Sequence, residues 1–492
     1  KFPLVSILIP TYNQTKYLKE ALESALNQTY PNVEIIIGDD STNGEVEEFI
    51  KYYTQKHKNI KYFRNEKNEL DYGLTNCQRL LEASNGEFVN YLFHDDIFAK
   101  DKIEKMMNYF LNNPELTLVT SSRQLIDSNG DKLPMELAFQ PIADNDIIIS
   151  GYEMTRYMVN NFINYIGEPT VVLFKKRYLE YGFGNFNGVA FKCNVDIAMW
   201  AQVLQYGDGA YIAEPLSYFR KHEEQNSNKI GLHIKGIIDF YHYIEQSYKI
   251  GVIRDHAEYK KIIVKWLKIF TDEIILYDKL LVEHHDELKY LRKIYMNIVN
   301  LLFENKEKYK VCPICGEKVE RFLPYQYKTN KTDFVYKYQI IGSDVEHFSC
   351  PACYSHDRER QIKKYFDKLD FWKKNILRKK ILHIAPEKHI QEIINGIETE
   401  EYVCGDLYPT SNNVVKVDIT DITYDDNYFD CIICNHVLEH VPNDYKAISE
   451  LYRVLKKDGV AILQTPYSDK LDISFEDDSI TMSKERKEFF GQ

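Results

Sequence analysis

The sequence predicts an α/β protein with two mostly parallel sheets, separated by a helical segment and a cysteine cluster. Three observations support this fold class. Apolar β-rich runs alternate with segments of helical period over residues 4–119, and the same alternation returns over residues 380–464. Between them, four cysteines form two Cys-x-x-Cys pairs. With 492 residues and 44% apolar content, the chain is long enough for about two to four domains.

The overall composition excludes some classes of protein. The formal net charge is -12, whereas nucleic-acid binding relies on clustered Lys and Arg, so we expect no nucleic-acid partner. Nine cysteines, four of them at metal-ligand spacing, suit a reducing compartment better than a disulfide framework. No run approaches the roughly 18–20 apolar residues that cross a bilayer. We therefore expect a cytoplasmic protein with at most a peripheral position at the inner face of the membrane.

The first module is predicted to begin with a strand over Leu4–Ile9, which Pro10 ends. A helix follows, in which apolar side chains recur every three or four residues, at Leu18, Ala21, Leu22, Ala25 and Leu26. Val33–Ile37 is a second β-rich run, and the next helix carries Val46, Phe49, Ile50 and Tyr53 on one face. Further strands are predicted at residues 60–63, 88–93 and 116–119. This alternation favours a mostly parallel sheet, whose ligand crevice lies beyond the carboxyl ends of its strands.

Polar residues gather at these predicted strand ends. They are Pro10, Thr11, Tyr12 and Asn13 after the first strand, Asp39, Asp40 and Ser41 after the second, and His94, Asp95 and Asp96 after the strand that follows Gly86. Adjacent carboxylates can hold Mg²⁺ or Mn²⁺ against a diphosphate. A single Asp-Asp pair is more often a solvated turn or a helix cap, but three polar clusters in register with three strands favour a binding site.

Residues 3–228 resemble the family 2 glycosyltransferases of the GT-A fold. The motifs that carry the resemblance are, in order, residues 5–13, 37–41, 86–88 with Asp95 and Asp96, 167–170, Asp196 with Trp200, and 218–222. The resemblance implies an inverting, metal-dependent transfer of a sugar from a nucleotide-diphosphate sugar to a hydroxyl group on a glycan or protein. A UDP-sugar is the expected donor.

The resemblance also implies roles for single residues. The nucleotide sugar would be bound by Pro10, Thr11, Tyr12, Asn13, Asp39, Asp40, Asn76, Asp95 and Arg220. Asp96, together with His222, would bind the Mn²⁺ or Mg²⁺ ion on the diphosphate. Asp196 would be the general base that takes the proton of the acceptor hydroxyl. Seen alone, Asp196 would be interpreted as a helix N-cap, and Asn76, Arg220 and His222 would be typical of plain surface.

Residues 231–309 carry apolar side chains at helical spacing with few glycines or prolines, which predicts helices packed on the first module. Two Cys-Pro-x-Cys knuckles follow, formed by Cys312, Cys315, Cys350 and Cys353. Each knuckle puts two thiolates on a tight turn, as tetrahedral Zn²⁺ requires. Because four thiolates leave no open coordination position, we expect a structural zinc. Four free core cysteines are the alternative.

The last module is predicted to hold a second parallel sheet. Its strands are expected at residues 380–385, 402–404, 414–417, 429–434 and 460–464, with a helix over Asp444–Leu455 before the last of them. Ile448, Leu451, Tyr452 and Leu455 form one apolar face of that helix. Acidic or polar residues again follow the strands, at Asp406, Asp418 and Asn435.

This last module resembles the class I S-adenosylmethionine-dependent methyltransferases in which a zinc ribbon precedes a strand that reads Leu-His-Ile-Ala-Pro-Glu, here residues 382–387. The resemblance also rests on Gly405-Asp406, Asp418, Phe429-Asp430 and residues 435–440. It implies that S-adenosylmethionine is bound by Ala385, Glu387, Asp406, Asp418, Asn435 and His436. Asp406 would take the ribose hydroxyls, and Asp418 would lie near the adenine. The sequence ends at Gln492, before the last two strands of a seven-stranded sheet, so an incomplete domain is expected.

The two resemblances together predict a bifunctional enzyme of surface-glycan or protein-glycan assembly. Its parts are a GT-A domain over residues 1–230, a helical bridge over 231–309, a zinc ribbon over 310–360 and a methyltransferase-like domain over 361–492. The alternative is a glycosyltransferase whose carboxyl-terminal half is a non-catalytic binding or scaffold module, because the cofactor loop lacks glycines. The net charge disfavours an RNA methyltransferase, and a methyltransferase loop explains residues 436–440 better than a zinc-peptidase motif does.

Overall fold

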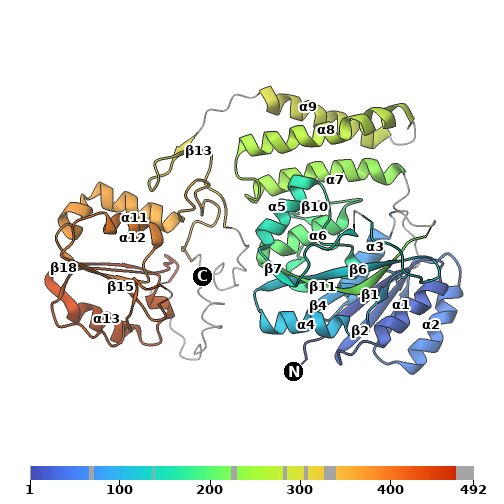
Figure 1. Ribbon diagram of the computed structural model, residues 1–492, viewed down its shortest axis with the longest axis horizontal. Helices are drawn as coiled ribbons and strands as arrows, with labels where there is room; N and C mark the ends of the chain where they lie inside the picture. The colour runs from blue at the N-terminus through green and yellow to red at the C-terminus, as the bar shows by residue number, and fades with distance from the viewer. Residues whose placement is uncertain are drawn as a thin grey trace. The chain divides into compact units, whose positions relative to one another are not determined.

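The computed structural model describes residues 2–65, 71, 73–136, 139–222, 230–280, 285–303, 309–325, 340–409 and 411–471. The chain divides into two compact units, of which the first runs from Lys1 to Lys306 and the second begins at Glu307. Figure 1 shows that each unit has its own sheet and its own helices. The four-part division predicted from the sequence stays a prediction.

Within the described residues, a nine-stranded sheet forms the centre of the first unit, in the order β3-β2-β1-β4-β8-β6-β11-β5 with β7 on β11. The strands are β1 (Val5–Thr11), β2 (Val33–Asp39), β3 (Ile60–Arg64), β4 (Phe88–Tyr91), β5 (Ile97–Phe98), β6 (Leu116–Ile126), β7 (Ile147–Ile149), β8 (Leu173–Lys175) and β11 (Asp208–Arg220). β1 to β4 are mutually parallel, and β8 runs antiparallel to both of its neighbours. The predicted mixed α/β fold with a parallel-dominated sheet is confirmed.

Helices cover both faces of this sheet. One face carries α1 (Lys16–Leu26), α2 (Glu45–Lys56) and α4 (Lys102–Asn112), and the other carries α3 (Leu74–Ala83), α5 (Gly151–Asn161) and α6 (Val195–Val203). Along β1, Ile7 faces the first group of helices and Leu8 faces the second, and both are fully buried. A strand that is buried on both faces reads as a continuous apolar run, which is why the sequence marks β1 so clearly.

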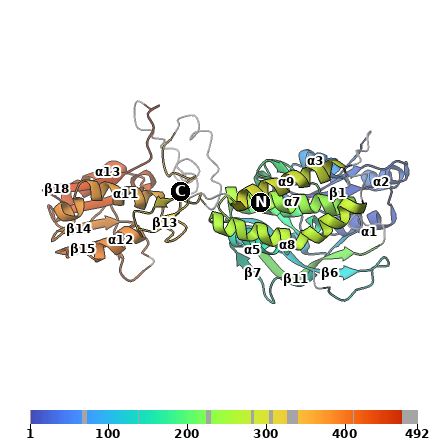
Figure 2. The ribbon, with the colours of Figure 1, turned by 90° about the horizontal axis from the view of Figure 1, so that it is seen from above.

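A helical layer lies outside α5 and α6 (Figure 1), and Figure 2 shows the same layer from above. It consists of α7 (Ile230–Lys249), α8 (His256–Leu280) and α9 (His285–Phe303). The Tyr243 hydroxyl on α7 donates to the Thr155 carbonyl on α5 at 3.0 Å, and Trp266 Nε1 on α8 donates to the Ile237 carbonyl at 3.1 Å. These helices therefore share the hydrophobic core of the first unit. No helix within the described ranges combines the length and the apolar character needed to cross a membrane.

Within the described residues, the second unit holds a five-stranded, fully parallel sheet in the order β16-β15-β14-β17-β18. The strands are β14 (Lys380–Ile384), β15 (Glu401–Asp406), β16 (Val415–Lys416), β17 (Phe429–Asn435) and β18 (Leu455–Gln464). The helices are α11 (Asp357–Lys368), α12 (Lys388–Asn395) and α13 (Asp444–Val454). The strand order reverses between β14 and β17, and open parallel sheets bind ligands at such a switch point.

The last strand begins earlier than the sequence predicts. Helix α13 ends at Val454, and β18 starts at once with Leu455, which pairs with Phe429. The register then shifts, so that Val460 pairs with Cys431. The four residues between form an irregular stretch that the apolar pattern does not reveal. The expected absence of two final strands concerns residues 472–492, which lie outside the described part of the chain.

Candidate functional site

The loops after β1 and β2 are joined into one platform at the rim of the first sheet. Thr11 and Asp39 end these strands as register partners, and the Asp40 N–H donates to the Thr11 carbonyl at 3.0 Å. Asn13 adopts a left-handed conformation with φ 48°, and its Oδ1 accepts from the Thr42 N–H at 2.9 Å. The platform is thus fixed by hydrogen bonds between residues almost thirty positions apart.

Two side chains of this platform are available to a ligand. Tyr12 is 48% exposed. Thr11 is 2% exposed, yet its Oγ1 has no hydrogen-bond partner among the described residues. A buried hydroxyl without a partner is unusual, and a bound polar molecule would satisfy it. The Pro10 carbonyl is already engaged, at 3.3 Å from His94 Nδ1.

The two neighbouring acids Asp39 and Asp40 differ in their surroundings. Asp39 is fully buried and accepts from the Ser41 N–H and from the Tyr62 hydroxyl, each at 2.8 Å. Asp40 accepts from Asn65 Nδ2 at 2.6 Å through Oδ1, and burial raises its pKa. Asp39 therefore holds the loop in place, whereas Asp40 is the better placed of the two for a ligand.

Asn76, which the sequence suggested for the donor, lies on α3 beneath the platform. It is 2% exposed, donates to the Gly38 carbonyl at 2.8 Å and accepts from Asn65 Nδ2 at 3.1 Å. A Cβ atom at position 38 would lie 2.2 Å from Asn76 Oδ1, so only glycine fits there. Asn76 thus supports the residues around Asp40 from behind.

Asp96 is a buried anchor rather than an open ligand. It is 1% exposed, and both carboxylate oxygens are used: Oδ2 accepts from the Thr170 hydroxyl at 2.6 Å, and Oδ1 accepts from the Arg220 N–H at 3.1 Å. Burial, and then the charge of Asp95, raise the pKa of Asp96 well above its usual value. The side chain joins the end of β4 to η2 (Pro169–Val171) and to the end of β11.

Asp95 faces His222 across the rim. Its Oδ2 lies 3.1 Å from His222 Nε2, and the two side chains are 19% and 12% exposed. Burial opposes the ionisation of Asp95, but the hydrogen bond to His222 and the nearby His94 outweigh it, so its pKa lies below the usual value. An ionised carboxylate beside an imidazole is a pair that a divalent cation accepts as ligands.

Arg220 holds the rim together from inside. The side chain is fully buried, with Nε donating to the Asp95 carbonyl at 2.8 Å and Nη1 to the Asp127 carbonyl at 3.1 Å. Nη2 forms an ion pair with Glu20, and the guanidinium lies 4.6 Å from the centre of the Tyr17 ring. Because these donors are taken by the protein, the structure makes Arg220 a positioning residue for Asp95.

Asp196 lies in the first turn of α6, whose N-cap is Asn194. Its Oδ2 accepts from Asn164 Nδ2 at 2.7 Å, and its Oδ1 accepts from the Ile197 N–H at 2.8 Å. Burial raises the pKa of Asp196 to about 6, which the two hydrogen bonds only partly oppose. A carboxylate with such a pKa exchanges protons near neutral pH.

The acids at positions 40, 96 and 196 belong to one rim. Asp40 is hydrogen-bonded to the end of β1, and β1 pairs with β4, which leads to Asp96. Glu168 lies near both Asp96 and Asp196, because its charge raises the pKa of each. Side chains more than 150 positions apart in sequence thus lie along the same edge of the sheet.

Several residues that build this rim carried no predicted role. They are Asn65, Asn164, Thr170 and Asp239, which hold Asp40, Asp196, Asp96 and the loop before α6, respectively. Thr170 belongs to a motif that the sequence analysis quoted. The other three stand in loops or on helices without a recognisable spacing, so no sequence signal could have selected them.

The four predicted zinc ligands converge in the second unit, beside the hairpin of β12 (Lys310–Val311) and β13 (Lys318–Val319). The sulfur atoms of Cys312, Cys315, Cys350 and Cys353 lie within 4.8 Å of one another. Cys312 Sγ and Cys353 Sγ are 3.9 Å apart, close to the roughly 3.8 Å between two thiolates that share one Zn²⁺ at about 2.3 Å. The donor set therefore fits a structural zinc.

His383 connects two polar groups at the end of β14. It is fully buried, with Nδ1 at 2.8 Å from the Tyr402 hydroxyl and Nε2 at 2.8 Å from Glu387 Oε2. Glu387 Oε1 accepts from Asn435 Nδ2 on β17 at 3.0 Å. Burial opposes the ionisation of Glu387, but the hydrogen bond from His383 outweighs it and its pKa lies below the usual value. The chain Tyr402–His383–Glu387 thus places a fixed negative charge at the switch point.

Buried acceptors without donors surround this charge. Asn435 Oδ1, Glu439 Oε2 and Gln464 Oε1 accept no hydrogen bond from any described residue. Asn435 and Gln464 are register partners on β17 and β18, and Glu439 Oε1 lies 3.1 Å from His436 Nδ1. A cationic ligand with N–H donors would satisfy such acceptors, so these residues fit the ammonium group of S-adenosylmethionine.

The loop after β14, residues 385–387, turns without a glycine. Ala385 and His436 end the neighbouring strands β14 and β17 with φ values of 46° and 54°, and Ala385 N–H donates to the Gly405 carbonyl at 2.8 Å. Non-glycine residues rarely adopt this conformation, and such strain gathers at functional sites. Asp406 ends β15 and caps the next turn through the Tyr408 N–H at 2.8 Å. Asp418 is exposed and accepts from Thr420, which lowers its pKa.

Family models match a part of each unit. A family model described as glycosyl transferase family 2 matches residues 6–182, and one described as a methyltransferase domain matches residues 387–463. An uncharacterized glycosyltransferase of Rickettsia felis is 32% identical over 239 residues, which is 47% of this chain and 36% of that protein. Another, of Methanocaldococcus jannaschii, is 39% identical over 133 residues, which is 27% of this chain and 45% of that protein.

A search of solved structures matches S. aureus TarS 1-349 in complex with UDP-GlcNAc, at 17% identity and a TM-score of 0.42, covering 58% of this chain and 78% of that one. This chain spans about a third of the length of the Rickettsia felis relative that it matches.

Proposed function

We propose that this chain, which carries a family 2 glycosyltransferase domain followed by a methyltransferase domain, transfers a sugar from a nucleotide-diphosphate sugar to a hydroxyl acceptor, with inversion at the anomeric carbon. The two resemblances predicted from the sequence are confirmed by the family models. The observation that carries the proposal is the single rim that joins Asp40, the Asp95–His222 pair and Asp196. Surface-glycan or protein-glycan assembly is the proposed setting.

The platform after β1 and β2 would bind the nucleotide. Tyr12 offers an exposed ring for a base, and Thr11 Oγ1 and Asp40 offer polar groups for base or ribose. Pro10, Asn13 and Asp39 would hold the backbone of this platform rather than contact the donor directly. A UDP-sugar is the donor class to assay first.

Asp95 and His222 are the pair that we propose for Mn²⁺ or Mg²⁺, in place of the predicted Asp96 with His222. Both oxygens of Asp96 are bound within the protein, whereas Asp95 is partly exposed and ionised. A divalent cation at this pair would neutralise charge on the departing diphosphate. Arg220 and Asp96 keep Asp95 oriented from the buried side.

Asp196 would act as the general base. A base must be ionised to accept the acceptor proton, and efficiency is greatest when its pKa lies near the working pH. Asn164 and the Ile197 N–H orient the carboxylate. The acceptor hydroxyl would approach on the side of α6, opposite the departing nucleotide, which is the geometry of an inverting displacement.

The second unit would bind S-adenosylmethionine at the switch point of its sheet. Glu387, Asn435 and Glu439 would face the cationic part, with Ala385 and His436 shaping the loop. Asp406 would take the ribose and Asp418 the adenine side. When bound, this cofactor supplies an already activated methyl group, so the protein needs mainly to position it. The unpartnered acceptors favour a ligand-binding module over an empty scaffold.

The decisive experiment measures nucleotide-diphosphate release from a panel of UDP-sugars with and without Mn²⁺. Wild-type protein should release UDP from at least one donor in a metal-dependent manner. Asp95→Asn should raise the Mn²⁺ concentration for half-maximal release by about 10–100-fold, because ligands and their partners typically contribute that much to metal affinity.

Asp144→Asn is the matched control, since it removes one exposed carboxylate of the same unit outside the rim. No release from any donor by the wild-type protein would contradict the proposal. Unchanged metal dependence in Asp95→Asn would contradict the assignment of the cation to Asp95.

A further inference from the structure

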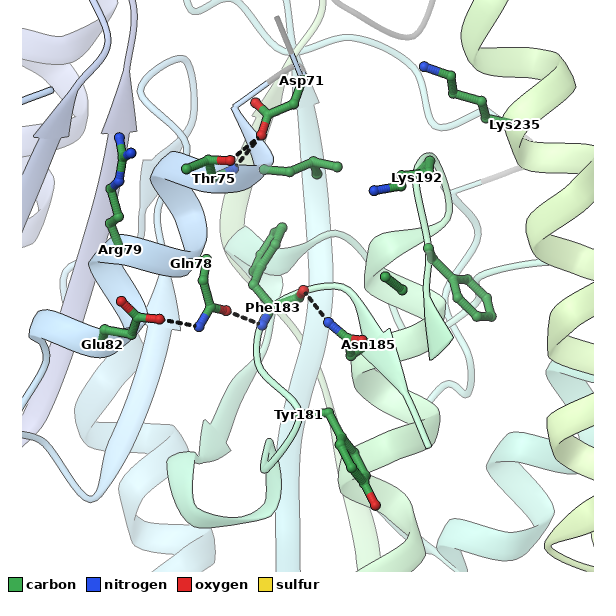
Figure 3. Close-up of a pocket in the computed structure, with 13 residues that line it drawn as sticks. Asp71, Thr75, Gln78, Arg79, Glu82, Tyr181, Phe183, Asn185, Lys192 and Lys235 are labelled. Atoms are coloured by element: carbon green, nitrogen blue, oxygen red, sulfur yellow. Dashed lines mark hydrogen bonds between the residues drawn. The ribbon is translucent and has the colours of Figure 1, made fainter. Parts of the chain in front are cut away.

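The first unit holds a cavity of about 530 Å³. None of the residues that line it is among those proposed to bind the donor or the metal or to act as the base. Its walls come from three elements: α3 with the turn before it, the hairpin of β9 (Asn185–Phe186) and β10 (Val189–Ala190) with its flanking residues, and α7 (Figure 3). Cavities of this size are typical of sites for small ligands.

The cavity lies between the donor side and the base side of the rim. On one wall, Asp71 and Arg79 act electrostatically on the Asp40 carboxyl. On the opposite wall, Lys192 belongs to the segment that leads directly into α6 and Asp196. The charges of Asp196 and Lys235 both act on the Cys193 thiol, so they lie near the same point. The wall that carries Lys192 therefore leads along the chain to Asp196, and the wall that carries Asp71 and Arg79 neighbours Asp40.

The cavity is built before any ligand arrives. Gln78 on α3 accepts from the Phe183 N–H at 2.7 Å and donates to Glu82 at 2.7 Å, which fixes the floor seen in Figure 3. Gly182, with φ 84°, fits because a Cβ atom there would lie 2.4 Å from Gln78 Oε1. On the other side, Asp239 of α7 accepts from the Lys192 N–H at 3.0 Å. A preformed cavity loses little entropy when it binds a ligand.

The walls combine an aromatic ring with positive charge. Tyr181 is 46% exposed and lines the end of the cavity that lies away from Lys192 and Lys235 (Figure 3). The wall carboxylates are engaged locally, since Asp71 accepts from the Thr75 N–H at 2.8 Å and Glu82 accepts from Gln78. Lys192 is exposed and forms no ion pair with any described carboxylate, and Figure 3 shows its amine directed toward α3.

Lys235 adds a second ammonium group to the same wall. Lys235 Nζ lies 4.0 Å from Glu287 Oε1 of α9. A cavity with ammonium groups at one end and an aromatic ring at the other suits a sugar that carries an anionic substituent, because the sugar packs on the aromatic face and its charge pairs with the lysines.

We propose that this cavity is the acceptor subsite, and that it takes a sugar bearing a carboxylate or phosphate group. The inference rests on the proposed glycosyltransferase activity and specifies its acceptor class. Lys192 and Lys235 bind the anionic group, Tyr181 supports the ring, and the reacting hydroxyl is turned toward Asp196. A neutral sugar lacks the charge that the two lysines recognise and binds more weakly.

Binding of glucose, glucuronic acid and glucose 6-phosphate to the full chain, without donor, tests the proposal by saturation-transfer NMR titration. The two anionic sugars, or the one whose anionic group the site prefers, should bind about fivefold more tightly than glucose, since a partly exposed ion pair contributes up to about 1 kcal/mol. Comparison of glucuronic acid with glucose 6-phosphate tells which anionic group is preferred.

Lys192→Ala should lower the affinity for the anionic sugar toward that for glucose, with Lys235 still in place, and Lys192→Arg should retain it. Tyr181→Ala should weaken all bound sugars alike. Lys58→Ala, which removes an exposed lysine on the loop before β3, should change nothing. Equal affinity for the three sugars, no binding of either anionic sugar, or unchanged selectivity in Lys192→Ala would overturn the proposal. UDP release by the wild-type protein reports separately on the proposed function, so either can fail without the other.

Discussion

At the scale of residues, the chemistry of the rim depends on how burial sets the charge of each acid. Asp95, Asp96 and Asp196 are the same residue type, yet the pKa of Asp95 is lowered while those of Asp96 and Asp196 are raised. The difference comes from partners: His222 stabilises the ionised form of Asp95, and burial disfavours it at the other two. Each acid is therefore suited to a different task.

The first prediction concerns the pH dependence of sugar transfer. If Asp196 is the base, it must be ionised, and burial raises its pKa to about 6. Activity should therefore be low at pH 5 and rise with a midpoint near pH 6. Asp196→Asn should lower the rate by about 10²–10⁴-fold and remove this rise. The check is the rate of transfer, measured from pH 5 to pH 8.

Stability supplies the control for this variant. Because the folded-state pKa of Asp196 is above its unfolded value, its contribution to stability is greatest at low pH and is lost as pH rises through about 6. Asp196→Asn removes the cost of the buried charge, so above pH 6 it should unfold at a temperature a few degrees higher, corresponding to about 1–3 kcal/mol. A lower unfolding temperature at pH 8, or an unchanged pH profile, would contradict this account.

The sequence identified the acidic pair at positions 95 and 96, but it did not show which of the two carboxylates is accessible to a ligand. That choice is made by Thr170 and the Arg220 N–H, which bind Asp96 from 74 and 124 positions away. A motif reports that two carboxylates are adjacent, whereas their exposure depends on packing that brings distant strands together. The same holds for Arg220, whose motif is clear in the sequence and whose burial is not.

At the scale of elements, α7 holds the loop that precedes α6, the helix that carries Asp196. Asp239 is 2% exposed, and its Oδ2 accepts from the backbone N–H groups of Lys192, Cys193 and Asn194 at 3.0, 2.7 and 2.9 Å. These N–H groups precede α6. Helical periodicity predicted that helices follow the first module, but it could not show that one of them holds the active loop.

The second prediction tests this contact. Asp239→Ala leaves three N–H groups without their acceptor and should destabilise the first unit by about 1–3 kcal/mol. Below the unfolding temperature it should also lower kcat for transfer, with KM for the donor unchanged, because the base is displaced while the nucleotide platform is not. Asp239→Asn keeps one acceptor oxygen and should restore part of kcat. A wild-type kcat in Asp239→Ala would show that the loop does not need this anchor.

The ends of β14 and β17 carry the third prediction. Glu387 is anionic because His383 and Asn435 donate to it, and it lies at the switch point of the sheet. Glu387→Gln keeps the shape but removes the charge, and it should weaken S-adenosylmethionine binding about tenfold, as expected for loss of a partly buried charge pair of about 1.4 kcal/mol. Isothermal titration calorimetry measures the affinity directly.

Two further variants interpret that result. Tyr402→Phe removes the hydroxyl group that contacts His383 Nδ1. It should weaken binding less than Glu387→Gln does, because it acts on Glu387 only through the histidine. Glu392→Gln, on the exposed side of α12, is the matched control and should bind as the wild type does. Equal weakening of S-adenosylmethionine and S-adenosylhomocysteine by Glu387→Gln would assign the charge to the ammonium group. Unchanged affinity would remove Glu387 from the site.

At the scale of the whole molecule, two units with separate cores should unfold separately. The cysteine cluster belongs to the second unit, which begins at Glu307. Zinc that is bound by the four thiolates in the folded state stabilises the unit that carries them and not the other unit. Differential scanning calorimetry should therefore show two transitions, of which a chelator lowers one.

Zinc removal should also weaken cofactor binding, because the second knuckle is hydrogen-bonded to the cofactor loop. The Cys353 carbonyl lies 3.1 Å from His389 Nε2, and Glu359 Oε1 accepts from the His389 N–H at 3.0 Å. His389 stands in the first turn of α12, two residues after Glu387. Loss of the metal frees the knuckle and with it the start of α12. We expect chelation to lower the affinity for S-adenosylmethionine and restored Zn²⁺ to recover it. UDP release by the first unit, measured after Mn²⁺ has been added back, should stay unchanged. Equal loss of both activities would mean that the two units do not fold independently.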